Sequence, residues 1–259
     1  MIDSHCHIDF PDFDHDRTDV LHRCDVLGIT GLIVPAVTAN TFTRTINTCA
    51  SSESLHLALG LHPAFIAQHQ PQDLNTLDVL IEHHQPIAVG EIGLDFHQSN
   101  AHLDKEKQIA YFTKQLIIAK HHRLPVIIHN RKAHDDCLAI LRDTSVRGGI
   151  IHAFNGSIQQ AHKYIELGFL LGFGGMLTFA RSNKLIQLAK RIPLNAIALE
   201  TDAPDMTVQQ HKGERNSPEY LPYVQDALAN IKNTSHANVA STTSNNIHKI
   251  FKLQDTHHT

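Results

Sequence analysis

The feature that most constrains the fold is an eightfold alternation between short apolar runs and longer segments whose apolar residues have helical spacing. The apolar runs are nearly continuous, which is typical of parallel strands buried on both faces. They cover residues 2–8, 31–37, 56–61, 87–92, 125–129, 149–153, 169–173 and 196–201. The alternation predicts an α/β fold built on a parallel sheet.

The chain length favours a closed barrel over an open sheet. Eight strand–helix units in 259 residues leave about 32 residues for each unit, which suits a (β/α)8 barrel of the TIM type. Ser157 is placed to cap one helix, and Gly168 is placed to end it. No linker rich in Gly, Ser or Pro divides the chain, so we expect residues 1–259 to form one domain. Helical spacing covers residues 17–27, 73–84, 103–122, 157–167, 183–191, 218–231 and 237–251.

Composition excludes several classes of protein. Hydrophobic residues make up 42% of the chain and charged residues 19%, which argues against disorder. The net charge of −4 argues against a tight, sequence-independent duplex binder, although a few local cations can hold a nucleic-acid substrate. No apolar run reaches the ~18–20 residues of a membrane-spanning helix, and polar residues interrupt the N-terminus where a secretory signal needs an apolar stretch.

The cysteines favour a reducing compartment. Cys6, Cys24, Cys49 and Cys137 are scattered and form no Cys-x-x-Cys pair, which argues against a zinc ribbon or a redox motif. Reduced thiols are typical of cytosolic proteins. We therefore expect a soluble, cytoplasmic protein with no membrane partner, and we expect a monomer.

The strongest local signal is the pair His5 and His7 at the end of the first apolar run. Because side chains on a strand alternate with period two, both imidazoles point into the barrel, whereas Cys6 points toward the surrounding helices. Two imidazoles on one face can hold one metal ion. Taken alone, the pair also fits two ordinary histidines.

Ionisable residues recur at matching places on other strands. Glu91, His129, His152 and Asp202 end the fourth, fifth, sixth and eighth runs. Such a group at the end of a buried strand is costly unless it is paired or bound to metal. The C-terminal ends of barrel strands are also where active sites of this fold lie. The pattern therefore indicates a metal site rather than chance.

Closure of the barrel decides which of these groups can meet. The eighth strand adjoins the first, so Asp202 can meet the two histidines of the first strand, and neighbouring strands bring His129 to His152. Glu91 lies between them as a bridging carboxylate. We therefore expect a site that holds two divalent ions about 3.5–4 Å apart. Mixed imidazole and carboxylate ligands suit zinc, manganese or iron, and magnesium prefers more oxygen, so zinc, manganese and magnesium all stay open.

Seven motifs in this sequence resemble those of the TatD family of metal-dependent hydrolases, and the resemblance runs almost end to end. They are DSHCHID (3–9), GLHP (60–63), GEIGLD (90–95), IHNRKA (128–133), HAFNGS (152–157), ETDAP (200–204) and RNSP (215–218). The resemblance implies an amidohydrolase-like barrel with 3′-exonuclease or related deoxyribonuclease activity on single-stranded DNA or RNA. It implies six metal ligands, namely His5, His7, Glu91, His129, His152 and Asp202.

Two places depart from the family pattern. Asp205 and Met206 stand where many members carry an aromatic residue and a leucine, and His211 stands where the family often has an aromatic residue. These changes lie near the expected substrate loops. They leave the metal chemistry intact and bear on the substrate, and they resemble a less-characterised TatD-like branch.

We assign catalytic roles to Asp202 and Glu91. Metal coordination lowers the pKa of a bridging water toward neutrality. As a hypothesis, Asp202 holds metal and also orients or deprotonates that water, while Glu91 bridges the ions. Cations after the strands are candidates for holding a substrate phosphate, because a guanidinium binds phosphate by two parallel hydrogen bonds. They are Arg131, Lys132, Arg181, Lys212 and Arg215, of which the two in family motifs, Arg131 and Arg215, are the assigned substrate contacts.

Three further residues are expected to support the site. His62 ends the third strand and is either a substrate contact, a donor to a ligand or a structural histidine. Asp95 is placed to orient a ligand imidazole. Glu200 lies one layer below Asp202, where a buried supporting hydrogen bond is expected. Four aromatic residues after strands could stack bases or simply pack, namely Phe65, Phe96, Phe154 and Phe179.

Other functions stay open at this point. A two-metal barrel can hydrolyse esters or amides as well as phosphodiesters, because a fold does not fix a function, and an aminoacyl-tRNA deacylase is one such enzyme. A non-catalytic metal-binding scaffold is the alternative from another class. Loss of one or more ligands would support such a retired enzyme, and all six expected ligands are present.

Overall fold

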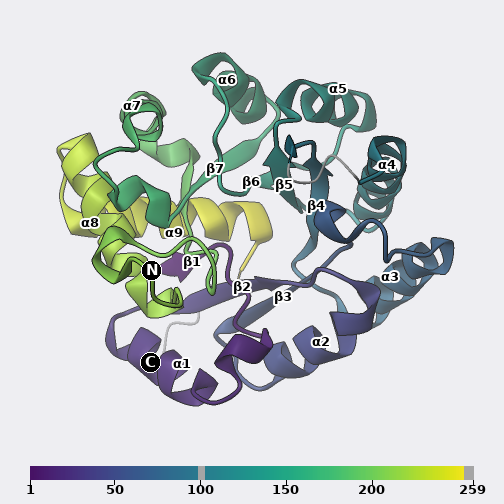
Figure 1. Cartoon of the computed structure of the whole chain (residues 1–259), viewed down its shortest axis with the longest axis horizontal. Helices are drawn as coiled ribbons and strands as arrows, with labels where there is room; N and C mark the ends of the chain where they lie inside the picture. Colours follow the sequence, from purple (N-terminus) through teal and green to yellow (C-terminus); the bar gives the residue numbers. More distant parts are fainter. Residues whose placement is uncertain (99–102, 254–259) are drawn as a thin grey trace.

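The computed structural model describes residues 1–98 and 103–253 and shows a barrel of strands within a ring of helices (Figure 1). All eight strands are parallel and follow one another in chain order. The predicted (β/α)8 barrel is confirmed. The strands are β1 (Ile2–Asp3), β2 (Gly31–Pro35), β3 (Leu55–Leu59), β4 (Ala88–Asp95), β5 (Val126–Arg131), β6 (Gly149–Ile151), β7 (Phe169–Phe173) and β8 (Ile197–Leu199).

The barrel closes between the segments that contain β1 and β8. Ser4 N donates to the Leu199 carbonyl at 2.9 Å, and Asp202 N donates to the His5 carbonyl at 2.8 Å. These bonds extend past the ends of both strands, since β1 ends at Asp3 and β8 at Leu199. The expected first and eighth strands were therefore too long, and the residues that follow them run side by side as irregular but hydrogen-bonded chain.

Nine helices lie within the described residues and surround the strands or cover one end of them. They are α1 (Arg17–Val26), α2 (Phe42–Ala50), α3 (Pro71–His84), α4 (Lys105–His121), α5 (His134–Thr144), α6 (Ile158–Glu166), α7 (Asn183–Arg191), α8 (Leu221–Lys232) and α9 (His236–Phe251). None of the described helices is long and apolar enough to cross a membrane. As expected, Ser157 caps α6 by accepting a hydrogen bond from Gln160 N at 3.2 Å, and Gly168 follows the helix with a positive φ of 85°.

Two of these helices, α2 and α5, were not among the ranges expected from the sequence. The segment FTRTINTCA of α2 is rich in threonine, and β-branched side chains lower helix propensity. The helix nevertheless buries Phe42, Thr45 and Cys49 against the barrel. Tertiary packing has overridden local propensity here.

One end of the barrel is sealed by apolar side chains. Each strand contributes one residue to a buried layer, and α9 covers that layer with Ile247 and Phe251. Because this end is filled, a substrate can enter the barrel only at the opposite, C-terminal ends of the strands. The strand residues of the layer are Ile2, Ile33, Ala58, Ala88, Ile127, Ile150, Leu170 and Ala198.

Candidate metal centre

His5 and His7 point to the same place, although they follow β1 rather than belong to it. Their Nε2 atoms lie 3.2 Å apart, and they lie 3.7 and 3.8 Å from Asp202 Oδ1. His7 Nδ1 is 3.1 Å from the Pro35 carbonyl and donates a hydrogen bond to it. The tautomer with hydrogen on Nδ1 leaves the Nε2 lone pair of His7 free for a cation.

Glu91 occupies the centre of the site. It lies within β4, which continues to Asp95, where the pairing register with β5 shifts between Val89 and Ile92. One carboxylate oxygen, Oε2, is 3.1 Å from His5 Nε2. The other oxygen, Oε1, is 3.1 Å from His129 Nδ1. The two oxygens therefore face different histidines, which is the arrangement of a carboxylate that bridges two ions.

Carboxylates behind the ligand candidates orient two of the imidazoles. Asp95 Oδ2 lies 3.2 Å from His129 Nε2, and Glu200 Oε2 lies 3.2 Å from His152 Nδ1. Both carboxylates are buried. Glu200 is also fixed by Ala153 N, which donates to its Oε1 at 2.7 Å. Buried partners of this kind set the tautomer and orientation of metal-binding histidines.

His62 also reaches Glu91. Its Nε2 lies 3.1 Å from Glu91 Oε1, and its Nδ1 accepts a hydrogen bond from Ala64 N at 3.0 Å. With Nδ1 acting as acceptor, neutral His62 carries its hydrogen on Nε2 and donates it to Glu91. Burial lowers the pKa of His62 and favours this neutral form. The geometry supports the donor interpretation among those left open by the sequence.

The two central carboxylates are ionised. Burial alone raises the pKa of Glu91, but His62 and His5 outweigh burial and hold that pKa well below its usual range. Burial likewise opposes ionisation of Asp202, and His152 outweighs it and lowers the pKa. An ionised carboxylate only accepts, which is the form that binds cations. Burial lowers the pKa of the His5 ring, which keeps it neutral.

His129 is doubly protonated and positively charged at neutral pH when no cation is bound to its ring. Burial lowers its pKa, but hydrogen bonds to Asp95 and Glu91 outweigh burial and raise the pKa to about 9. A metal ion bound at this ring would replace that proton. His129 therefore links metal binding to pH.

The donor set fits divalent metal. Three groups of three side chains place one possible ligand atom each within 4.8 Å of one another: His5, His7 and Asp202; His5, Glu91 and His152; and His62, Glu91 and His129. Imidazoles gathered around ionised carboxylates in a buried site are the ligands that zinc, manganese and iron prefer. The buried Nε2 atoms of His5 and His7 also face each other, an arrangement that a cation between them would satisfy.

The grouping differs in part from the one expected from the sequence. His5, His7 and Asp202 come together as expected. His152 lies in a group with His5 and Glu91, and its ring centroid is 6.5 Å from that of His129. His152 instead stacks on His5, with 3.7 Å between centroids.

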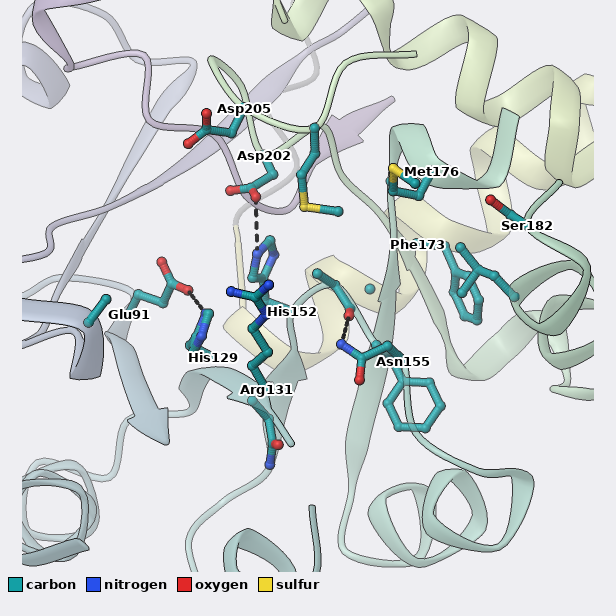
Figure 2. A pocket seen from close by; sticks show the side chains of 18 of the residues that line it. Glu91, His129, Arg131, His152, Asn155, Phe173, Met176, Ser182, Asp202 and Asp205 are labelled. Atoms are coloured by element: carbon teal, nitrogen blue, oxygen red, sulfur yellow. Dashed lines mark hydrogen bonds and ion pairs between the residues drawn. The ribbon is translucent and has the colours of Figure 1, made fainter. Parts of the chain in front are cut away.

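A pocket of about 920 Å³ opens directly onto these residues. Among its lining residues is Arg131, which Figure 2 shows extending into the pocket from the end of β5. Within residues 1–98 and 103–253, no hydrogen bond or ion pair engages the Arg131 guanidinium. Arg181 and Lys184 also line the pocket. Three cationic side chains thus gather in this pocket, although the whole chain has a net charge of −4.

Other expected contacts lie elsewhere. Arg215 does not line the pocket, because its guanidinium binds the carboxylate of Asp16 at 2.9 and 2.6 Å and stacks over Phe13. The structure thus gives Arg215 a structural role instead of the expected substrate contact. Lys132 and Lys212 are also absent from the lining. Of the four aromatic candidates, Phe65 and Phe154 line the pocket and Phe96 and Phe179 do not. Lys105 lies over the ring of Phe96, and the pocket residue Arg181 lies over the ring of Phe179.

Comparison with known proteins assigns the chain to a family. The model of the family described as TatD related DNase matches residues 2–252. The chain belongs to this TatD family. The uncharacterized metal-dependent hydrolase YjjV of Escherichia coli strain K12 is 35% identical over 256 residues, which cover 98% of each chain. The crystal structure of YjjV, a TatD homolog, matches with a TM-score of 0.93 at 36% identity over 98% of both chains.

The wider likeness of this TatD-family chain is to amidohydrolases. An amidohydrolase from Burkholderia multivorans with bound zinc has a TM-score of 0.60 at 12% identity, over 98% of this chain and 99% of that chain. At this identity the likeness shows the fold alone, and the fold is amidohydrolase-like as expected. The TatD membership makes the chain a metal-dependent hydrolase.

Sequence reasoning missed some residues of this TatD-family site. Asp3 is fully buried and holds the backbone of His5, and Asn155 and Lys184 line the pocket. Asp3 and Asn155 stand inside the quoted motifs DSHCHID and HAFNGS, so their position in those motifs was an available signal. Lys184 lies on α7 outside every quoted motif, and no sequence pattern distinguishes it from an ordinary surface lysine.

Proposed function

We propose that this chain hydrolyses phosphodiester bonds in single-stranded DNA or RNA, as a deoxyribonuclease of the 3′-exonuclease type. The observation that carries the proposal is the unpaired Arg131 guanidinium in the same pocket as Glu91 and Asp202. A cation left without a carboxylate partner beside acidic groups is arranged for an anionic substrate. The family description as a DNase supports the same chemistry.

We further propose that two divalent ions bind the ligand cluster, defined as His5, His7, Glu91, His129, His152 and Asp202. Glu91 faces histidines on both sides, so its two oxygens would help to hold both ions. When bound, divalent ions supply Lewis-acid stabilisation of charge on phosphoryl oxygens and make water more acidic. Zinc and manganese suit the imidazole-rich ligands best, and magnesium stays a candidate.

The chain's own residues then position the reactants. Arg131 binds two oxygens of the phosphate through its planar guanidinium. Asp202, whose side chain is 16% exposed, orients the attacking water and accepts its proton. Asp95 and Glu200 hold the His129 and His152 rings, and His62 donates to Glu91. The sealed opposite end of the barrel confines the substrate to this pocket.

The test begins with elemental analysis of the purified protein. The protein loaded with zinc, manganese or magnesium is then given end-labelled single-stranded DNA, RNA and aminoacyl-tRNA. Stepwise shortening of the DNA or RNA from the 3′ end is the expected result, and Asp202→Asn should abolish it with metal still bound. If aminoacyl-tRNA is the one substrate of the three that is hydrolysed, the chain is an ester hydrolase and the proposal is wrong. If the protein binds no metal and shows no activity, it is a non-catalytic binding protein.

If Asp202→Asn binds metal and keeps near-normal turnover, Asp202 is not the base.

The assignment of residues 1–259 to one domain, the cytoplasmic location and the monomeric state stay predictions.

A further inference from the structure

The pocket continues well beyond the ligand cluster into an apolar lobe, defined as Phe154, Phe173, Met176, Leu185 and Leu188. Phe154 follows β6 and Phe173 ends β7, while Leu185 and Leu188 stand on α7. Figure 2 shows Phe173 and Met176 on the side of the pocket away from Glu91 and His129. The cavity thus has a charged half and an apolar half.

The apolar lobe is part of the open cavity. Every residue of the lobe lines the pocket. Met176 and Leu185 are partly exposed there, whereas the other three side chains are buried. Gly172 and Gly174 also line the pocket, and a side chain at Gly172 would collide with the Glu200 carboxylate behind it. A concave apolar wall beside a few polar groups is the usual form of a site for a small organic group. Hydrolysis of the phosphodiester itself does not need such a wall.

Polar groups edge the apolar lobe in a way that suits a planar, heteroatom-bearing ring. Asn155 and Ser182 line the pocket next to it. Lys184 Nζ donates to the Asn155 carbonyl at 2.8 Å, which ties α7 to the loop after β6 and fixes the edge of the lobe. The Asn155 amide donates to the Ala153 carbonyl at 3.3 Å and its Oδ1 lies 3.2 Å from His134 Nε2, so one amide N–H is left for a ligand. That N–H and the Ser182 hydroxyl can bond the polar edge of a base while the apolar side chains cover its faces.

We propose that the apolar lobe binds the nucleobase of the nucleotide whose phosphate is held at Arg131. This inference rests on the proposed function and names the part of the substrate that the pocket recognises beyond phosphate. The charged half of the cavity suits the phosphate of a nucleotide, and the adjoining apolar lobe suits its base. Because the Met176 side chain adapts in shape and every base has an apolar face, the lobe accepts different bases and adds affinity rather than strict sequence choice.

The first test measures binding without turnover. Metal-loaded protein is titrated calorimetrically with thymidine 5′-monophosphate and with 2-deoxyribose 5-phosphate, which lacks the base. We expect the nucleotide to bind about tenfold more tightly or better, the size of one stacking contact. Leu185→Glu should remove most of this difference, and Met176→Ala should reduce it. Equal affinities of the wild type for both ligands would overturn the proposal.

A matched control separates the apolar lobe from the charge of the variant. Gln187 lies on the same helix, is exposed and does not line the pocket, so Gln187→Glu should keep the wild-type preference for the nucleotide. Thermal melting of each variant checks that α7 still packs. A Leu185→Glu protein that folds and keeps the full preference would also overturn the proposal.

The second test compares cleavage of two oligonucleotides that differ only in a normal or an abasic 3′-terminal residue. Faster cleavage of the normal strand by the wild type, and loss of the preference in Leu185→Glu, are expected. Equal cleavage of both strands would refute the lobe's role and leave the nuclease proposal standing. Cleavage of neither strand, together with base-dependent binding, would refute the nuclease proposal and leave the base site standing.

Discussion

The Asp3 carboxylate accepts hydrogen bonds from both the backbone amide and the hydroxyl of Thr201, across the seam where the barrel closes. The same carboxylate accepts from His5 N at 3.1 Å. Thr201 directly precedes Asp202 in the chain. One buried side chain thus ties together the two segments that bring His5 and Asp202 to the site.

Removing this carboxylate should cost both stability and metal affinity. Asp3→Ala leaves three buried donors without their acceptor, and each such loss costs about 1–3 kcal/mol before relaxation. We expect the free energy of unfolding to fall by about 2–4 kcal/mol in urea, with weaker metal binding. Asp25→Ala, at an exposed position on α1, is the control and should behave as the wild type. Wild-type stability of Asp3→Ala would contradict the seam role.

Because Glu91 lies at the centre of the site, its substitution should reduce metal content and turnover more than substitution of the carboxylates behind the ligands. Glu91→Gln keeps the size of the side chain but removes the charge that faces histidines on both sides. We expect it to lower metal content and to reduce turnover by more than the ~10–100-fold typical of changes at supporting residues. Glu200→Gln supplies the comparison at a supporting residue. Equal losses in the two variants would argue against bridging by Glu91.

Arg131 should act on substrate binding and leave metal binding unchanged. In Arg131→Lys, a single ammonium replaces a guanidinium that can bind two phosphate oxygens at once. We expect KM for a single-stranded oligonucleotide to rise about tenfold in Arg131→Lys and further in Arg131→Ala, with wild-type metal content. Lys132→Ala is the neighbouring control, because Lys132 does not line the pocket. An unchanged KM in Arg131→Ala would remove the phosphate role.

Metal binding should release protons. With its pKa raised to about 9, His129 is protonated at pH 7 in the metal-free protein, and a bound ion must replace that proton. Release from His129 alone makes the affinity fall about tenfold for each pH unit that the solution is lowered below neutrality. The fall should be steeper still, because Glu200 and Asp202 outweigh burial and raise the pKa of His152 well above its usual value. Calorimetry in buffers of different ionisation enthalpy measures the release directly. Heats that do not depend on the buffer would show that no proton leaves.

The cysteines should be inert in the folded protein. Burial raises the pKa of Cys24, Cys49 and Cys137 to about 12. A thiol-specific disulfide reagent at pH 8 should therefore label none of the four native cysteines and all four after unfolding. The unfolded chain ionises its thiols above about pH 9, so this contribution to stability is present below that pH and declines as the pH rises toward 12. Rapid labelling of the native protein would contradict the burial.

Position along the strands was enough to predict that the six side chains of the proposed ligand cluster lie together, because residues that follow parallel strands converge at one end of a barrel. The same logic could not predict the grouping of His152, whose ring stacks on His5 across the barrel instead of turning toward its neighbour His129. Such choices depend on side-chain rotamers and on partners such as Glu200. Strand order alone does not contain them.

Arg215 shows a second limit of sequence reasoning. Its place in a family motif and in a loop after β8 suggested a substrate contact, yet Asp16, some 200 residues earlier in the chain, satisfies its guanidinium. A cation in the sequence does not reveal whether a distant carboxylate pairs with it. Helix α2 was missed for a related reason, since its threonine-rich segment becomes helical only by packing on the barrel.

The cover that α9 forms over the closed end of the barrel has a consequence for synthesis of the chain. Every strand precedes α9 in the sequence, so the ribosome completes the whole sheet before residues 236–251 emerge. Until then the apolar layer that Ile247 and Phe251 later cover stays in contact with water. The nascent barrel therefore exposes an apolar surface from the time β8 is made until α9 emerges, and this surface is where a chaperone would recognise the unfinished protein.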